Sequence, residues 1–227
     1  MRIAVALFFF LVGVTAQAET IAIIGTGHVG GALGPEFAAQ GHTIIYGSRN
    51  AARNGVADLV MRTGNGASAT SQAEAAAQAG IVVLAVPGML VEEITNNLGD
   101  LSGKIIIDPT NPLNFAHSRV RHGVETSNAE IIQQAAPGAH VVKAFNTLSW
   151  QYMVDPDSSG GVLTIPLVGD NDEAKAVVAN LVKSIDLHPI DVGPLEYAHW
   201  VEGMAILLIN NNIGPLPAFN FHLRELD

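Results

Sequence analysis

The sequence predicts an α/β fold: a doubly wound, mainly parallel β-sheet with a small helical portion at the C-terminal end. Two observations indicate this class. Short runs rich in β-branched residues alternate along the chain with alanine-rich stretches of helical length. Several of the short runs are apolar throughout, as expected for parallel strands that helices cover on both faces.

The individual elements follow from this alternation. Strands are expected at 21–24, 43–46, 81–86, 104–107, 140–143, 163–168 and 186–192. Helices are expected at 29–40, 50–62, 71–79, 90–98, 127–135 and 172–184, and a last apolar helix at 195–212. Ser127 and Glu130 have the spacing of a capping box at the start of one helix. The segment 114–122 is expected to be a loop.

Residues 1–18 have the order of a secretory signal peptide: Arg2, an apolar run, and then Ala16-Gln17-Ala18. Cleavage after Ala18 would leave no stable membrane insertion and would export the protein to the periplasm or the medium. An uncleaved anchor and a misassigned start are the alternatives, and the latter would leave the protein cytoplasmic. Residues 19–227 fit a single domain, with a C-terminal extension from about 195.

The composition excludes several classes of site. The chain has 21 acidic and 11 basic residues, a net charge of -10 and no cysteine. The acidic balance argues against nucleic acid and anionic membranes as partners. Without cysteine, the chain has neither disulfides nor thiolate ligands. No Ser-His-Asp set and no H-E-x-x-H spacing is visible, so neither a metal site nor a certain catalytic residue is predicted.

The strongest motif is the G-x-G-x-x-G pattern at 25–30, which directly follows a predicted strand and opens a helix. Gly25 would allow the tight turn, Gly27 would let the backbone approach a pyrophosphate, and Gly30 would let the helix pack close to the strand. Free N–H groups at the helix start would hold the phosphates. This context predicts a Rossmann-type dinucleotide site, and a glycine-rich turn without a ligand is the alternative.

The end of the second predicted strand distinguishes NADP from NAD. NAD sites usually carry Asp or Glu there, which accepts hydrogen bonds from the ribose hydroxyls. This chain instead has Gly47-Ser48-Arg49, with Arg53 one helical turn later. Arginine binds phosphate through paired N–H donors. These residues predict NADP(H), unless both arginines are simply solvated at a helix start.

Five segments together resemble the NADP oxidoreductase family that includes the coenzyme F-420-dependent NADP reductases of archaea. They are GTGHVG at 25–30, GSR at 47–49, AVP at 85–87, DPTNP at 108–112 and VKAFNT at 142–147. Many families share the glycine motif, whereas the second and fifth segments are more specific. The same domain type forms the cytoplasmic part of the STEAP metalloreductases.

The resemblance implies a set of cofactor contacts. The glycine loop itself would contribute Gly25, Thr26, Gly27, His28, Val29 and Gly30. The residues implied at the adenosine 2′-phosphate region are Thr26, Ser48, Arg49 and Arg53. Val86 and Pro87 would pass beside the ribose. The residues implied at the nicotinamide are Asn111, Pro112, Ala144, Phe145 and Asn146.

The resemblance also implies the chemistry, which is direct hydride transfer between NADP(H) and a flavin or coenzyme F-420 as a small-molecule acceptor. Such a reaction depends on positioning of the two rings. The family usually dimerises, so a homodimer is expected, with the apolar helix near 205–209 as a candidate surface. The leader and the tail from Pro215 depart from the family pattern, which leaves the identity of the acceptor open.

Two other functions stay open. A sensor or subunit that binds a dinucleotide without turnover would suit an exported protein, because NADPH is not expected to be plentiful outside the cytoplasm. A Rossmann reductase of a small carbonyl or imine would need a proton donor, and Lys143 is the nearest candidate. The basic segment with His117, Arg119, Arg121 and His122 would attract an anionic acceptor, or carry ordinary solvated charges.

Overall fold

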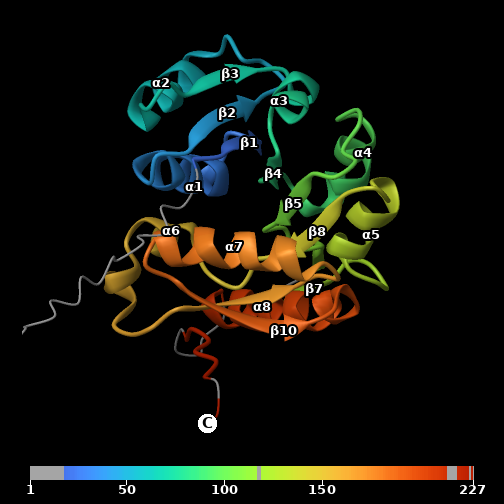
Figure 1. The fold of residues 1–227 in the computed structure, drawn as a ribbon. Helices are drawn as coiled ribbons and strands as arrows, with labels where there is room; N and C mark the ends of the chain where they lie inside the picture. The colour runs from blue at the N-terminus through green and yellow to red at the C-terminus, as the bar shows by residue number, and fades with distance from the viewer. Residues whose placement is uncertain (1–17, 117–118, 214–218, 225, 227) are drawn as a thin grey trace, which may run out of the picture.

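The predicted fold class is confirmed. In a computed structural model, which describes residues 18–116, 119–213, 219–224 and 226, an eight-stranded sheet is layered between helices (Figure 1). Its strands are β1 Thr20–Ile24, β2 Thr43–Gly47, β3 Ser68–Thr70, β4 Ile81–Leu84, β5 Ile105–Asp108, β8 His140–Lys143, β9 Thr164–Val168 and β10 His188–Gly193. A separate hairpin consists of β6 Leu113–Ala116 and β7 Arg119–His122.

The longer helices are α1 His28–Ala39, α2 Asn54–Thr63, α3 Gln72–Gln78, α4 Val91–Asn96, α5 Asn128–Ala135, α6 Trp150–Val154, α7 Asp172–Ser184 and α8 Ala198–Asn212. Short 3-10 helices lie at Gly88–Leu90, Pro156–Ser159 and Leu195–Tyr197. Ser127 caps α5 by accepting a hydrogen bond from the backbone N–H of Glu130, as the spacing predicted.

The strand order is β10-β9-β8-β5-β4-β1-β2-β3. The six strands from β3 to β8 are parallel, whereas β9 is antiparallel to β8 and parallel to β10. The strands β2 and β3 are added on one side of β1, whereas β4 and the strands after it lie on the other side, so the strand order reverses between β1 and β4. Ligands of doubly wound sheets bind in the crevice outside the carboxyl ends of the strands at such a reversal. The ends of β1 and β4, at Ile24 and Leu84, therefore locate the expected site.

Alternate residues of each strand face two separate apolar cores, because successive side chains of a strand point to opposite faces. Ile21 and Ile23 pack with α1, α2, α6 and α7 on one face. Ala22 and Ile24 pack with α3, α4, α5 and α8 on the other. This double burial explains why the strands are continuous apolar runs.

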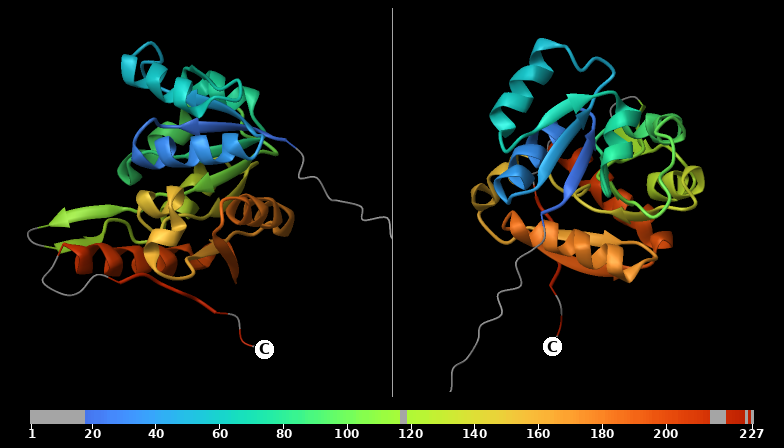
Figure 2. Two further views of the ribbon diagram at one scale, coloured as in Figure 1. Left: turned by 90° about the vertical axis from the view of Figure 1, so that its left-hand side faces the viewer. Right: turned by 45° about the horizontal axis from the view of Figure 1, so that its top comes forward.

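Four segments differ from the predicted elements. The predicted loop at 114–122 is wrong, because β6 and β7 form an antiparallel hairpin there. The hairpin projects beside α8 (Figure 2), where the Asn210 side chain both accepts from and donates to the backbone of Val120. The short strand β3 and the helix α6 were not predicted. The helix predicted at 50–62 begins later, at Asn54.

The leader 1–17, His117 and much of the tail lie outside the described residues, so the signal peptide stays a prediction. Among the residues that are described, no helix has the length and apolar character needed to cross a membrane.

Candidate functional site

The glycine turn after β1 has the geometry that its sequence predicts. Gly25 has φ +111°, and a Cβ there would lie 2.1 Å from the carbonyl oxygen of Ala85. A Cβ on Gly30 would lie 2.2 Å from the carbonyl oxygen of Gly25. Both positions therefore require glycine, the first for its backbone conformation and the second for close packing of α1 against the turn.

Gly27 differs from these two glycines, because an added Cβ would meet no protein atom within 4 Å. Its surface is exposed at the start of α1, whose first turn contains no acidic residue. The backbone there is accessible to an anion, and the helix N-terminus attracts one. His28 is exposed beside it and stacks on Trp150, with ring centroids 4.9 Å apart. Val29 is half-buried behind the turn.

The basic residues after β2 lie beside this turn. Arg53 is the N-cap of α2, and its guanidinium donates to the hydroxyl of Thr26 at 3.3 Å. Ser48 accepts a hydrogen bond from the backbone N–H of Asn50 at 3.2 Å. Arg49 and Arg53 are both exposed, and the first turn of α2 has no acidic residue. The structure thus joins Thr26 to Arg53, from two loops 27 residues apart.

The loops after β4, β5 and β8 meet beside the glycine turn, where Gly25 lies against Ala85. Val86 is half-buried and Pro87 is exposed in the loop after β4. The next residue, Gly88, lies so close to the following loop that a Cβ would be 2.0 Å from the carbonyl oxygen of Asn111. Asn111 and Asn146 form two hydrogen bonds of 3.0 Å, which hold the loops after β5 and β8 together.

Four of the five residues predicted near the nicotinamide are buried, and three of them are apolar. Pro112, Ala144 and Phe145 have little or no exposed surface, and the Phe145 ring packs edge-on against Phe37. Phe145 has φ +64°, an uncommon conformation for a residue with a side chain. Ala144 and Phe145 therefore belong to the protein interior, and neither exposes surface to a ligand in this structure.

Two polar atoms at the end of β8 lack hydrogen-bond partners among the described residues. They are Oδ1 of Asn146 and Oγ1 of Thr147, and these residues are 5% and 4% exposed. Unpaired buried polar atoms are costly, so these two atoms beside the joined loops fit a ligand that supplies the missing partner.

A buried ionic cluster lies directly behind these loops, and the sequence analysis did not predict that its members meet. Lys143 Nζ contacts Asp108 Oδ2 at 2.6 Å, Glu202 Oε1 at 2.8 Å and the carbonyl oxygen of Thr110 at 2.7 Å. All three side chains have no exposed surface. Burial disfavours the charged form of Lys143, but Asp108 and Glu202 outweigh this and hold the pKa of the ammonium above its usual value.

His122 completes the cluster from β7. Its Nε2 lies 3.0 Å from Glu202 Oε2, and its Nδ1 lies 2.7 Å from the carbonyl oxygen of Val124. Burial raises the pKa of Glu202 to about 7, against the attraction of Lys143. Burial also lowers the pKa of His122, against the hydrogen bond to Val124. The His199 ring packs on His122 with centroids 4.1 Å apart.

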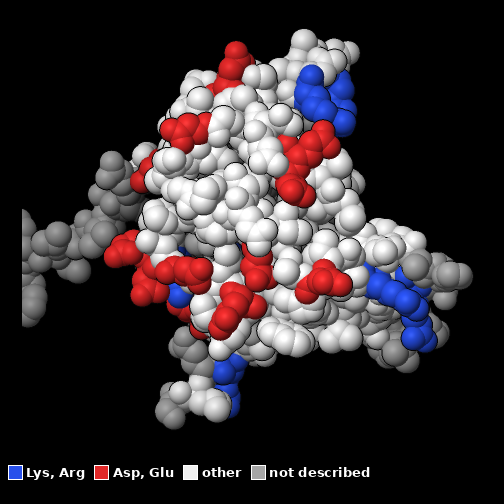
Figure 3. Space-filling view, turned by 90° about the vertical axis from the view of Figure 1, so that its right-hand side faces the viewer, with Lys and Arg blue, Asp and Glu red and all other residues white. Residues whose placement is uncertain are grey.

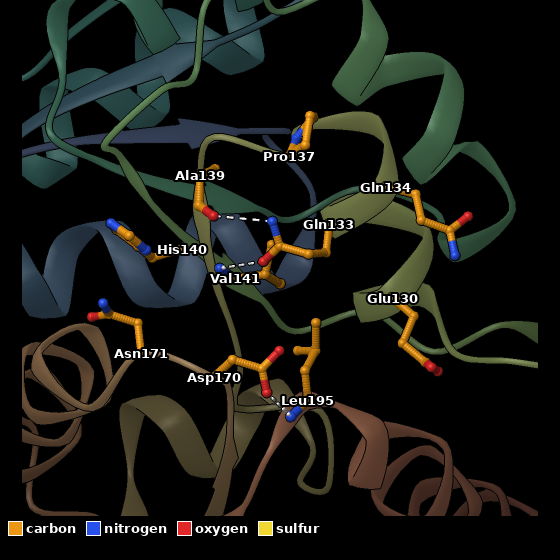
Figure 4. A pocket seen from close by; sticks show the side chains of 10 residues that line it. All are labelled: Glu130, Gln133, Gln134, Pro137, Ala139, His140, Val141, Asp170, Asn171 and Leu195. Carbon is orange, nitrogen blue, oxygen red and sulfur yellow. Dashed lines mark hydrogen bonds between the residues drawn. The ribbon is translucent and has the colours of Figure 1, made fainter.

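A cavity of about 640 Å³ opens elsewhere, between α5, the start of β8 and the loop after β9 (Figure 4). Gln133 bridges the backbone of Ala139 and Val141 within it, and Asp170 accepts from the N–H of Leu195. His140 begins β8, and β9 runs antiparallel to β8, so this cavity lies at the edge of the sheet opposite the glycine turn. It is separate from the crevice described above.

Acidic side chains are spread over the face shown in Figure 3, whereas basic ones gather at its margins. Arg119 and Arg121 are exposed on β7, so the predicted basic segment keeps its charge on a hairpin strand rather than a loop. Among the described residues, no group of three or more His, Asp or Glu side chains is arranged to hold a metal ion.

Comparison with known proteins gives one consistent relationship. The family model "NADP oxidoreductase coenzyme F420-dependent" matches residues 20–112. The F420-dependent NADP reductase of Methanothermobacter thermautotrophicus is 31% identical over 208 residues, which are 85% of this chain and 89% of that reductase. A crystal structure from Arthrobacter sp. FB24, ascribed to an F420-dependent NADP reductase, has a TM-score of 0.78 and 32% identity over 85% of this chain and 92% of its own.

The metalloreductase STEAP3 of Rattus norvegicus is also 31% identical, over 88% of this chain. The chain spans only 39% of the length of STEAP3. The reductase from Methanothermobacter, in contrast, is matched over 89% of its length. The chain therefore belongs to the F420-dependent NADP reductase family of NADP-dependent oxidoreductases.

Proposed function

We propose that the protein transfers a hydride between NADP(H) and a flavin or deazaflavin ring, such as coenzyme F-420. The observation that carries this proposal is the pairing of two features at the ends of the parallel strands: the exposed Gly27 backbone at the start of α1, and the loops of Asn111 and Asn146, which two hydrogen bonds join. The first feature suits a pyrophosphate and the second an aromatic amide ring. Bound NADPH would supply the hydride.

The adenosine end of the cofactor would lie between the glycine turn and α2. Thr26 and Arg53 already contact each other there, and Ser48 and Arg49 lie on the adjoining turn. This set offers hydroxyl and guanidinium donors without a nearby carboxylate at the end of β2, which suits a 2′-phosphate better than a ribose hydroxyl.

The nicotinamide end would lie against the loops after β5 and β8. Asn146 Oδ1 is a buried acceptor without a protein partner among the described residues, and a carboxamide N–H is a donor of the required type. Asn111 and Pro112 would form the rest of this surface, and the buried Ala144 and Phe145 would support it from the interior. Their contribution is orientation, because hydride transfer requires the donor and acceptor carbons at about 3–3.5 Å.

The test is to mix the purified protein with NADPH and with FMN, FAD, F-420 or a ferric chelate in turn, and to follow NADPH oxidation. Oxidation with a flavin-like acceptor supports the proposal. Tight binding of NADPH without oxidation by any acceptor would instead identify a sensor or subunit, and the lack of any binding would reject both functions.

The structure argues against Lys143 as the proton donor of a carbonyl or imine reductase. Its side chain is fully buried, and its three N–H donors are engaged by Asp108, Glu202 and Thr110. No donor is left to reach a substrate in the crevice, so this role does not fit Lys143.

We also propose that the protein forms a homodimer through α8 and the hairpin beside it. Trp200 and Leu207 are seven residues apart on one face of α8 and are 71% and 62% exposed, and Phe115 on β6 is 73% exposed. Large exposed apolar residues on neighbouring elements are typical of interaction surfaces. Light scattering should then give a dimer that Leu207→Glu converts to a monomer, and a monomeric native protein would reject the proposal.

A further inference from the structure

The hairpin of β6 and β7 carries two arginines to which the binding of NADP(H) gives no role. Arg119 and Arg121 are both exposed on β7, in a chain whose net charge is -10. We propose that they form an anion-binding surface for the tail of the acceptor, so that the protein selects flavins or deazaflavins with phosphate or carboxylate groups over the bare ring. This inference rests on the proposed function and specifies its substrate class.

The base of the hairpin is fixed to the loop at which the nicotinamide is expected. The hairpin follows β5, so it leaves the sheet at the carboxyl ends of the parallel strands. Leu113, the first residue of β6, pairs with His122 at the end of β7. The next residue, Gly123, donates its N–H to the carbonyl oxygen of Pro112 at 2.7 Å. An acceptor ring stacked on the nicotinamide would therefore lie close to this base.

The two arginines lie on the face of the hairpin that is turned away from α8. His122 contacts Glu202 on α8 at 3.0 Å, and Val120 is only 3% exposed, so these β7 residues mark the face that packs on the helix. Successive strand side chains point to opposite faces, which places Arg119 and Arg121 on the other one. In the left view of Figure 2, α8 lies below the hairpin, and the half of the molecule with β1, α1 and α2 lies above it. The basic face is thus turned toward the half that contains the glycine turn.

The positive charges follow one another along a line that leads away from the base of the hairpin. A strand rises about 3.4 Å per residue, so the Cα atoms of Arg121 and Arg119 lie about 7 and 14 Å beyond Gly123. Asn114 pairs with Arg121 across the hairpin and is exposed on the same face. This spacing suits an extended tail with two anionic groups, attached to a ring at the base.

The protein itself does not neutralise this surface. Within the part of the chain that the structure describes, no ion pair joins Arg119 or Arg121 to an acidic side chain. Two neighbouring like charges repel each other, and a guanidinium binds phosphate or carboxylate through paired N–H donors. The phosphates of NADPH are expected at the glycine turn and near Arg49 and Arg53, so the hairpin surface suits a second anionic ligand.

The first test measures acceptor binding to the protein loaded with NADP⁺, so that no turnover is needed. Two pairs of ring compounds differ in the anionic tail: riboflavin and FMN, and the deazaflavin analogue of riboflavin and coenzyme F-420. Fluorescence titration at low ionic strength should show that the compound with the tail binds about three- to tenfold tighter in at least one pair. Added salt should weaken the binding of that compound and leave the bare ring unaffected.

Substitution of the arginines should remove this preference. The double variant Arg119→Ala/Arg121→Ala should bind the compounds with and without the tail equally. Arg119→Lys/Arg121→Lys should keep part of the preference, because it retains the charge but loses the paired donors. Lys183→Ala removes an exposed positive charge on α7 and should change nothing. All of these variants should bind NADPH as tightly as the native protein does.

The outcomes separate the two proposals. Equal affinity for rings with and without the tail in the native protein, or a preference that persists in Arg119→Ala/Arg121→Ala, would overturn the anion-binding surface and leave the proposed function standing. No binding of any ring compound would also overturn it. If FMN or F-420 binds through the arginines but no acceptor oxidises NADPH, the proposed function fails and the anion-binding surface stands.

The second test separates the arginines from a structural role of the hairpin. With FMN or F-420 as the acceptor, Arg119→Ala/Arg121→Ala should raise the KM for that acceptor by about three- to tenfold. The kcat, the KM for NADPH and the KM for the matching bare ring should stay the same. A loss of kcat, or an equal rise of KM for the bare ring, would mean that the substitutions disturb the hairpin and would contradict recognition of a tail.

Discussion

At the scale of single residues, the fold requires glycine at position 30, whereas only the ligand is expected to require it at position 27. Gly30→Ala would force a Cβ into the carbonyl oxygen of Gly25, so we expect the free energy of unfolding to fall by about 1–3 kcal/mol. Gly27→Ala meets no protein atom and should leave the unfolding free energy within about 0.5 kcal/mol.

The effect of a glycine substitution on NADPH binding should not follow its effect on stability. Gly27→Ala places a methyl group where the pyrophosphate would approach the backbone, so it should weaken NADPH although the protein stays stable. Urea unfolding and NADPH titration on the same samples make the comparison. Unimpaired NADPH binding by Gly27→Ala would contradict a pyrophosphate at this turn.

Arg49 tests the preference for NADP over NAD. Arg49→Ala should weaken NADPH by more than about 1.4 kcal/mol, a factor of ten, and leave NADH nearly unchanged, because only NADPH carries the 2′-phosphate. Lys183→Ala removes an exposed positive charge at the end of α7 and should affect neither cofactor. Equal weakening of NADPH and NADH by Arg49→Ala would argue against the phosphate contact.

At the scale of elements, the capping of α3 offers a measurable local contribution. The Ser71 hydroxyl accepts from the N–H of Glu74, and the Glu74 carboxylate accepts from the N–H of Ser71. Ser71→Ala removes one half of this box and should lower the unfolding free energy by about 1 kcal/mol.

The exposed Ser68 in β3 provides the control for this cap, and Ser68→Ala should have a much smaller effect. Chemical denaturation of both variants distinguishes the cap from a general loss of serine. Equal destabilisation by the two substitutions would show that the box contributes nothing particular.

At the scale of the whole molecule, Glu202 makes stability depend on pH in a predictable direction. Its pKa is about 7 in the folded protein against an ordinary 4.5. The native state therefore binds this proton more tightly than the unfolded chain does. The resulting stabilisation is fully present below pH 4.5 and is lost as the pH rises to about 7.

Glu202→Gln has no proton to bind at this position, so it isolates the effect. The unfolding free energy of the native protein minus that of Glu202→Gln should fall between pH 4.5 and about 7, by at most roughly 3 kcal/mol. The unfolding free energy of the native protein minus that of Glu196→Gln, which lacks an exposed carboxylate just before α8, should not change over the same pH range. A difference that rises with pH would mean that Lys143 lowers the pKa of Glu202 more than burial raises it.

The glycine turn and the fold class were predictable because their causes are local. Glycine is required at positions 25 and 30 by atoms of the same turn and of the loop after the neighbouring strand. The continuous apolar runs indicate that the strands are buried on both faces. The strand β3 has only three residues, which is too short a run to recognise from the sequence. The hairpin at β6 and β7 was missed because part of its support comes from Asn210, a residue about 90 positions away.

The Rossmann-type architecture and the basic, carboxylate-free end of β2 could be predicted from the sequence, since periodicity and residue type at a strand end are properties of contiguous residues. The meeting of Asp108, Lys143, Glu202 and His122 could not, because it depends on the tertiary structure. Strand order brings β5 beside β8, and packing brings α8 and β7 onto their ends. Neither spacing nor composition encodes that contact, because the charges are paired through space between elements up to 94 positions apart, from Asp108 to Glu202.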